Sequence, residues 1–116
     1  MKSIKYTLDA ADKLRRLNQY ISQEYGKLKA KKVIKSITGA IRGLADNECK
    51  GSAVSNMFDV VTDYRYLFVS GNYVFYRIEE KCIRIINIYN EREDFMWQLF
   101  RINTTPQETI DYWGEE

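Results

Sequence analysis

The sequence predicts an α+β fold in which two helices pack against an antiparallel sheet. Residues 4–8 alternate between apolar and polar side chains, as in a short strand. Apolar residues then recur every three or four positions as far as Leu44, and three segments rich in aromatic and branched residues follow between positions 64 and 89. Because the turns between those three segments are too short for a crossover, the strands should be antiparallel, with the helices packed against their sheet.

The composition predicts one globular domain of no extreme charge. The chain has 116 residues, of which 45% are hydrophobic and 29% charged. The net charge is +2, so only a local basic patch could bind nucleic acid. There is no histidine, and the only cysteines, Cys49 and Cys82, have no metal-site spacing, so we expect reduced thiols and neither metal nor cofactor. No apolar run is long enough to span a membrane and no signal peptide is recognisable, which predicts a cytoplasmic protein.

The first half of the chain predicts a strand followed by two antiparallel helices. Asp9 stands where a helix N-cap would be, and Asp12 falls in the first turn. Gly26 is the natural break between the two helices, and the short link makes them an αα-hairpin. The first apolar stripe comprises Ala10, Leu14, Leu17 and Ile21, and the second comprises Ala30, Val33, Ile34, Ile37, Ala40, Ile41 and Leu44.

A basic stripe follows the other side of the second helix. Lys27, Lys31 and Lys35 are four residues apart, and Arg42 continues the line. Such a stripe is often only a solvated helix face. The alternative is a surface for an acidic partner, either phosphate or a protein.

The second half predicts a loop, a three-stranded meander and C-terminal helices. Residues 46–63 should be irregular. Strands follow at 64–69, 73–78 and 82–89, joined by turns at 70–72 and 79–81, and the last strand should be covered on both faces. Alternation puts Arg77 on the face of Tyr73 and Phe75, and Arg84 on the face of Ile86 and Ile88. Helical spacing returns at 91–100, and a capping box at 105–108 predicts a short last helix.

The stretch from position 64 to 94 resembles the C-terminal half of RelE/ParE toxins of type II toxin–antitoxin systems. The resemblance rests on Tyr64-Arg65, Asn72-Tyr73, the run Phe75-Tyr76-Arg77-Ile78, the Ile-rich segment 83–88 and Arg92-Glu93-Asp94. The helical hairpin agrees in plan, whereas Cys49-Lys50-Gly51 stands where the family often has Pro-x-x-Gly. The resemblance implies a toxin domain over residues 1–100, with residues 101–116 as an extension packed on the same domain.

The resemblance leaves two activities open. ParE-like members inhibit growth by poisoning DNA gyrase, and such modules stabilise plasmids. RelE-like members are ribosome-dependent mRNA endonucleases, and only these would contact nucleic acid directly; a non-toxic relative that binds the antitoxin is a third alternative. A nuclease without histidine would need cations and a proton carrier. The main candidates are Arg65, Arg77 and Arg92 for charge and Tyr89 for proton transfer, with Arg84 as a further cation and Glu91 or Glu93 as a carboxylate base.

Structural roles compete with those assignments. Arg77 could pair with Glu79 or Glu93, Arg92 could cap a helix or pair with Asp94, and Tyr89 could be an ordinary sheet residue. The long hairpin, the small net charge, and Tyr73 at a position that is often basic in the family favour the ParE-like activity over the nuclease.

The resemblance also implies a cognate antitoxin that lies across apolar and basic surface. The predicted contacts comprise Tyr6, Tyr64, Tyr66, Tyr73, Phe75, Lys27, Lys31 and Lys35. The competing expectation is that these aromatic residues all belong to the core.

Overall fold

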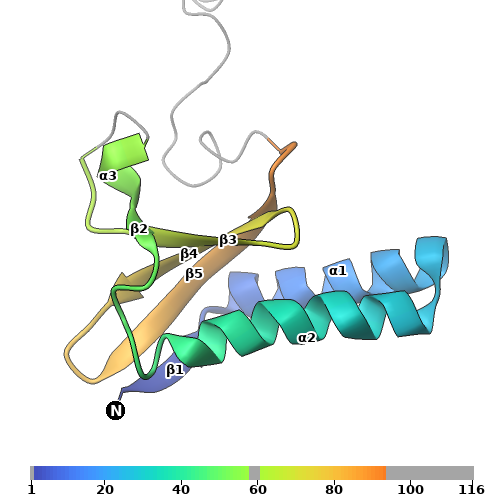
Figure 1. The fold of residues 1–116 in the computed structure, drawn as a ribbon, viewed down its shortest axis with the longest axis horizontal. Helices are drawn as coiled ribbons and strands as arrows, with labels where there is room; N and C mark the ends of the chain where they lie inside the picture. Colours follow the sequence, from blue (N-terminus) through green and yellow to red (C-terminus); the bar gives the residue numbers. More distant parts are fainter. Residues whose placement is uncertain (1, 58–60, 94–116) are drawn as a thin grey trace, which may run out of the picture.

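The computed structural model describes residues 2–57 and 61–93 and confirms the α+β fold class (Figure 1). Among the described residues, no helix is both long and apolar enough to cross a lipid bilayer. In chain order the elements are β1 (Ser3–Tyr6), α1 (Leu8–Tyr25), α2 (Lys27–Gly43), β2 (Ser52–Ala53), α3 (Val54–Met57), β3 (Arg65–Val69), β4 (Asn72–Ile78) and β5 (Cys82–Asn90).

The sheet has five strands in the order β1-β5-β4-β3-β2. The β3-β4-β5 meander is antiparallel, as predicted. The sequence predicted the strand β1 but not its pairing: β1 lies parallel to β5, with Ser3 opposite Cys82. The strand β2, which lies antiparallel to β3, was not predicted. The prediction that residues 46–63 contain no regular structure is therefore wrong for β2 and for the short helix α3, both of which are too short to show a period.

The helical hairpin turns at Gly26, as predicted. This glycine has φ of 95°, a conformation that costs an L side chain energy. The start of α1 differs from the prediction, because Thr7 rather than Asp9 is the N-cap. The Thr7 Oγ1 accepts a hydrogen bond from the amide of Ala10 at 3.0 Å and donates one to the carbonyl of Ile86 at 2.7 Å.

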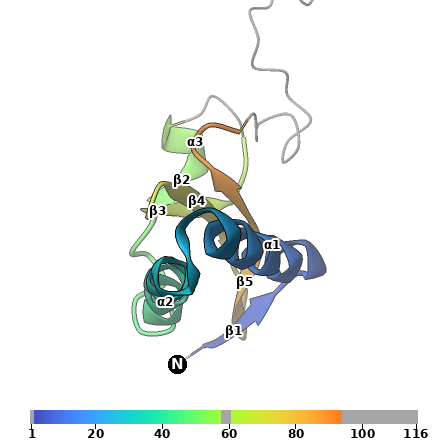
Figure 2. The same cartoon turned by 90° about the vertical axis from the view of Figure 1, so that its right-hand side faces the viewer.

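The main core lies between the helices and one face of the sheet. In Figure 2 both helices are seen nearly end-on and form one layer beside the strands. Helix α1 packs on β5, and α2 packs on β3. The predicted apolar stripes of both helices supply the helical side of this core. Its buried members are Ala10, Ile37, Ile41, Leu44, Leu67, Val74, Tyr76, Ile83, Ile85 and Ile88.

A β-bulge in β5 changes which residues share a face. Phe75 of β4 lies opposite Asn87, whereas the next residue, Tyr76, lies opposite Ile85, so Ile86 is the extra residue. Ile88 consequently joins the core on the helix side, together with Ile85, while Ile86 lies on the far side. The prediction that Ile86 and Ile88 share a face is therefore wrong, because strict alternation takes no account of a bulge.

The predicted turns before and after β4 are confirmed, although the first comprises only Ser70 and Gly71 between the strands. At the β3–β4 turn, Ser70 and Gly71 have φ of 52° and 75°, as a two-residue hairpin turn with positive φ requires. After β5, residues 91–93 form a turn rather than the start of the predicted helix. The rest of that helix, the predicted last helix and the extension at 101–116 lie outside the described residues.

Candidate functional site

Arg65 lies at the start of β3, on the helix side of the sheet. Its guanidinium donates hydrogen bonds to the carbonyl of Gly51 at 2.5 Å and to that of Cys49 at 3.2 Å. Its Nε lies 3.4 Å from the hydroxyl of Tyr76, the residue opposite it in β4. The side chain thus fastens the loop after α2 to the sheet.

Tyr76 and Gly51 complete that fastening. The buried Tyr76 hydroxyl accepts a hydrogen bond from the amide of Gly51 at 3.1 Å and donates one to the carbonyl of Glu48 at 2.9 Å. A Cβ on Gly51 would lie only 2.3 Å from the carbonyl oxygen of Tyr66. The glycine of the Cys49-Lys50-Gly51 segment is therefore required by close backbone packing.

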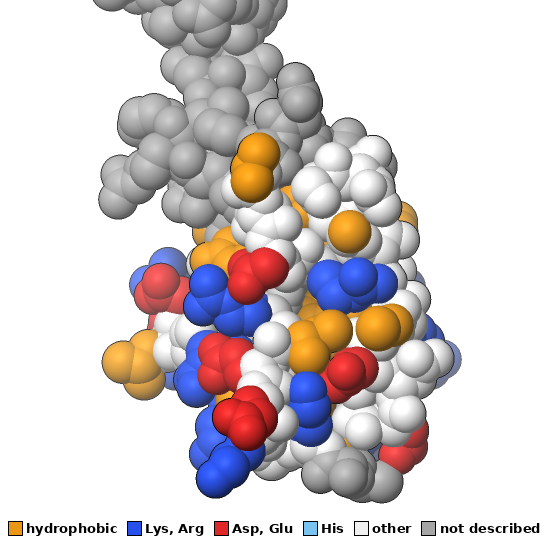
Figure 3. Space-filling model, turned by 90° about the vertical axis from the view of Figure 1, so that its left-hand side faces the viewer, with side chains coloured by type: hydrophobic (Ala, Val, Ile, Leu, Met, Phe, Trp, Pro, Cys, Tyr) orange, Lys and Arg blue, Asp and Glu red, His pale blue; other side chains and the backbone are white. Residues whose placement is uncertain are grey.

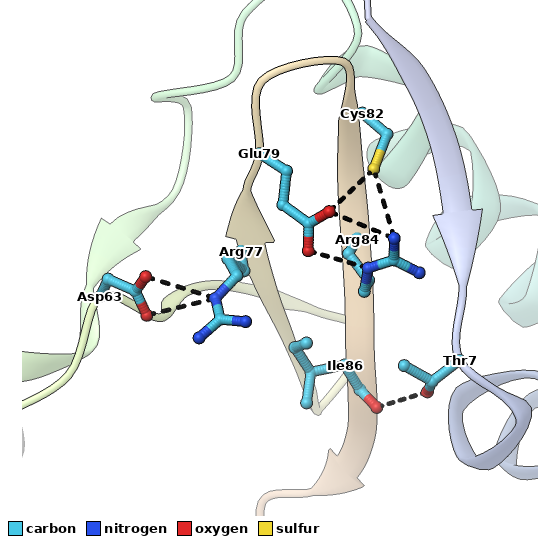
Figure 4. Close-up of polar contacts among 7 residues, drawn as sticks. All are labelled: Thr7, Asp63, Arg77, Glu79, Cys82, Arg84 and Ile86. Carbon is cyan, nitrogen blue, oxygen red and sulfur yellow. Dashed lines mark hydrogen bonds and ion pairs between the residues drawn. The ribbon is translucent and has the colours of Figure 1, made fainter.

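Arg77 lies on the opposite face of β4, where Figure 4 shows it pointing toward Asp63. Its Nε is 3.3 Å from a carboxylate oxygen of Asp63, and its guanidinium lies 5.6 Å from the ring centroid of Tyr64. The predicted pairing with Glu79 or Glu93 is wrong, because Glu79 is held by another arginine.

That other arginine is Arg84, directly across from Arg77 in β5. Arg84 donates two hydrogen bonds to the Glu79 carboxylate, at 2.8 and 3.1 Å (Figure 4). These hydrogen bonds lower the pKa of Glu79, and the carboxylate raises the pKa of Arg84. Figure 3 views the side of the molecule on which the β4–β5 turn lies, and acidic and basic side chains are interleaved there.

Tyr89 is buried near the other end of β5. Its hydroxyl accepts a hydrogen bond from the side-chain amide of Asn87 at 2.9 Å, and the Nζ of Lys13 lies 4.8 Å from the ring centroid. Burial raises the pKa of Tyr89, and the bond from Asn87 only partly opposes this. The hydroxyl therefore remains protonated at neutral pH, which suits packing better than base catalysis.

The structure does not bring the four main nuclease candidates together. Arg65 is paired with Tyr76, the neighbour of Arg77 in β4, so the two arginines lie on opposite faces. The residue opposite Arg77 is Arg84, five positions from Tyr89, which corresponds to roughly 16 Å along the strand. Arg92 is exposed in the turn after β5.

The predicted aromatic contacts gather on the sheet face away from the helices. Tyr64, Tyr66 and Tyr73 are half-buried and pack around Phe75, which is buried together with Tyr89. The Tyr66 and Tyr73 rings meet edge to face with centroids 5.7 Å apart. The expectation that these aromatic residues belong to the core is therefore confirmed for Phe75, whereas the three tyrosines are only half-buried. Tyr6 lies apart from them, at the end of β1.

The predicted basic stripe lines a groove, here called the lysine groove, of about 620 Å³ between α1 and α2. Lys27, Lys31, Lys35 and Arg42 form its basic side, and Ile34 supplies apolar surface. None of the residues lining this groove is acidic. The polar contributions of α1, Asn18 and Ser22, were missed by the sequence analysis, because packing against another helix leaves no pattern in a single helix.

A second concavity, here called the hairpin cleft, opens on the other flank of α2. It measures about 550 Å³ and lies between the helical hairpin, the β3–β4 turn and the end of β5. Its lining comprises Leu17, Tyr20, Ile21, Tyr25, Lys29, Val33, Ser70, Gly71, Asn72, Asn90, Glu91 and Arg92. Of these, the sequence analysis had considered only Glu91 and Arg92 as site residues, because the cleft joins segments that are far apart in sequence.

Comparison with known proteins agrees with this architecture. Residues 4–95 match the family model described as the ParE toxin of the type II toxin–antitoxin system parDE. A solved structure, described as the chromosomal ParDE TA system from P. aeruginosa, is similar with a TM-score of 0.66 and 24% sequence identity. The match covers 78% of this chain and 96% of that chain, and supports the fold. A search of curated proteins returned no match. Because the family model covers most of its length, this chain belongs to the ParE toxin family of type II toxin–antitoxin systems.

Proposed function

We propose that this toxin arrests growth in the cytoplasm by acting on DNA gyrase and that a cognate antitoxin neutralises it. The observation that carries the proposal is the match to the ParE toxin model over residues 4–95. The absence of histidine and the small net charge of +2 agree with a toxin that does not dock on ribosomal RNA.

The placement of the candidate catalytic residues supports the same choice. Ribonucleolytic cleavage needs its base, acid and cations around one phosphate. Here Arg65 is engaged by the loop after α2, Arg77 is paired with Asp63 on the opposite face, and Tyr89 has a raised pKa. These three residues thus have separate structural roles and do not form one active site.

The target is tested by two assays on the same purified toxin. We expect inhibition of gyrase supercoiling at toxin concentrations that leave ribosome-bound mRNA intact. Cleavage of that mRNA with unaltered supercoiling would replace the proposal with the RelE-like nuclease. A toxin that does neither and leaves growth unaffected would be a relative that only binds its antitoxin.

We place the antitoxin on the lysine groove, with the tyrosines of the far sheet face as a second contact. The lysine groove joins four cations to apolar surface and has no acidic lining, so it complements an acidic amphipathic segment. The tyrosines Tyr64, Tyr66 and Tyr73 lie on the side of the sheet that faces away from the helices. A single antitoxin chain that touches both surfaces would have to pass around an edge of the molecule.

The antitoxin contact is tested with two neighbouring lysines of α2. Lys31 lines the lysine groove, whereas Lys32 is exposed and lines neither that groove nor the hairpin cleft. We expect Lys31→Glu to weaken antitoxin binding roughly tenfold and Lys32→Glu to change it by less than about threefold. Equal losses in both variants, measured by calorimetry, would mean that only the overall charge of the helix matters.

A further inference from the structure

The tip of the helical hairpin carries apolar surface that the fold does not use. In Figure 1, α1 and α2 run past the end of the sheet, so their connection at Gly26 projects from the molecule. Tyr20 and Tyr25 are 57% and 67% exposed, and Leu28 is 80% exposed. Single exposed apolar residues are common, but Tyr20 and Tyr25 both line the hairpin cleft and together form a contact surface, whereas Leu28 lies outside that cleft.

The hairpin cleft lies beneath this tip and has a layered lining. Half-buried Leu17 and Val33, with buried Ile21, form apolar walls, and the exposed Tyr20 and Tyr25 form part of the rim. Its volume of about 550 Å³ is that of a site able to take one or two large side chains.

The charge at the rim of the cleft is partly uncompensated. Lys29 and Arg92 line it, and neither makes an ion pair with any other residue in the described part of the chain. The cleft also contains Glu91, whose amide is bonded to the carbonyl of Gly71 and whose carboxylate lies against that turn. Lys29 and Arg92 can therefore bind an anionic group of a ligand. The single carboxylate of the rim, that of Glu91, lies against the protein's own β3–β4 turn.

The first turn of α2 adds to the positive charge of this rim, and it does so at the expense of the stability of the helix. Lys27 and Lys29 occupy the first turn, which has no acidic residue, and Gly26 supplies no side-chain cap. Positive charge at a helix N-terminus opposes the helix dipole, so this choice of residues does not serve the helix itself.

The two flanks of α2 are thus different surfaces. Lys27, Lys31 and Lys35 line the lysine groove on one flank, while Lys29 and Val33 line the hairpin cleft on the other. Two such surfaces allow one toxin to bind an antitoxin and a target protein at separate places. The wholly basic groove suits an acidic antitoxin, whereas the cleft, with apolar walls and a mixed rim, suits a projecting side chain of a folded partner.

We infer that the hairpin cleft is the docking site for the target protein, which inserts a large apolar side chain between Tyr20 and Tyr25 with a carboxylate directed at Lys29 and Arg92. This inference rests on the proposed function, and takes gyrase as the target. It assigns the target and the antitoxin to opposite flanks of one helix.

The test compares variants at exposed positions in the full-length toxin. Tyr25→Ser and Lys29→Glu alter the cleft. Leu28→Ser is the matched control, because Leu28 is exposed at the same tip, at 80% against 67% for Tyr25, but lines neither the hairpin cleft nor the lysine groove. Growth arrest on induction, affinity for purified gyrase and affinity for the antitoxin are measured for each variant.

We expect both cleft variants to lose growth arrest and roughly tenfold or more of their gyrase affinity, with antitoxin affinity changed by less than about threefold. Retained antitoxin binding also shows that the variants fold. The inference is overturned if gyrase binding and arrest persist, if antitoxin affinity falls in parallel, or if Leu28→Ser is as damaging as Tyr25→Ser. Wild-type toxin that binds antitoxin but ignores gyrase would instead overturn the proposed function, and the inference with it.

Discussion

The two faces of the sheet have different chemistry although alternate residues of the same strands form them. In β4, Val74 and Tyr76 face the helices and are fully buried in a largely aliphatic core. Their neighbours Tyr73, Phe75 and Arg77 face away, among aromatic rings and ion pairs. The helix side therefore holds the fold together, and side chains with the chemistry to recognise a partner are found on the far side and on the outer surface of the helices.

The largest difference in stability between the two faces should appear when two consecutive residues of β5 are truncated to alanine. Ile85→Ala should destabilise the protein by about 2–5 kcal/mol, because Ile85 is fully buried in the helix-side core and truncation leaves a cavity. Ile86→Ala, on the half-buried far side, should cost about 1 kcal/mol. Urea unfolding measures both, and equal losses would show that the far face is as much a core as the other.

A second pair of substitutions tests the loop fastened to the helix side. Gly51→Ala should cost about 1–3 kcal/mol, because the new methyl group meets a backbone carbonyl at 2.3 Å and the Tyr76 hydroxyl at 2.7 Å. Gly39→Ala, in the middle of α2 with no atom within 4 Å, should instead stabilise by about 0.5–1 kcal/mol. If thermal unfolding showed both alanines to be stabilising, the close packing at Gly51 would be disproved.

Thr7 connects the start of α1 to the bulge in β5 by hydrogen bonds. Thr7→Ala should cost about 0.5–2 kcal/mol, because it removes the cap of α1 and the hydrogen bond to the carbonyl of the bulged Ile86. Thr38→Ala is the control, since the Thr38 hydroxyl only donates to carbonyls of its own helix, those of Ile34 and Lys35, and it should change stability by less than about 0.5 kcal/mol. Chemical denaturation would contradict this account if the two variants were equally stable.

The smallest effect concerns the ion pair at the β4–β5 turn. Arg84→Gln should raise the pKa of Glu79 toward its ordinary value, because the guanidinium bonds that lower it are lost. With a lowered folded-state pKa, Glu79 stabilises the fold above its unfolded pKa and loses that contribution as pH falls through the folded value. NMR titration of the carboxyl carbon measures the shift, and an unchanged midpoint would remove Arg84 as its cause. Global stability should hardly change, because exposed pairs contribute little.

Local signals in the sequence predicted the parts of the fold that depend on neighbouring residues. Gly26 marked the hairpin and Gly71 marked the β3–β4 turn, because glycine adopts positive φ readily. The positive φ of Ser70 was not predicted, since Asn72 was expected to share that conformation with Gly71. The parallel pairing of β1 with β5 joins positions about 80 apart, and no local pattern encodes it. The bulge at Ile86 was not predicted for a related reason, since a bulge is defined by how a strand pairs with its neighbour and not by the sequence of that strand alone.

The candidate site was predicted unevenly for the same reason. The lysine stripe followed from helical spacing, and the structure places it along one groove. The partner of Arg77 did not follow, because Asp63 lies in an irregular segment whose path the sequence does not fix. The hairpin cleft required three distant segments to be placed together, so only Glu91 and Arg92 among its lining residues had been considered as part of a site, and that site was a nuclease centre.

The pairing of β1 with β5 also sets an order in time. Ser3 and Tyr6 are synthesised nearly 80 residues before their partners Cys82 and Ile85. Helix α1 packs mainly on β5, so the helical hairpin is not fully docked until that strand is made, even though α2 can pack on β3 earlier. Contacts of such long range form late and slow folding. An interrupted round of synthesis that stops before β5 would therefore release a chain without a fully docked hairpin, and toxicity would begin only with a nearly finished domain.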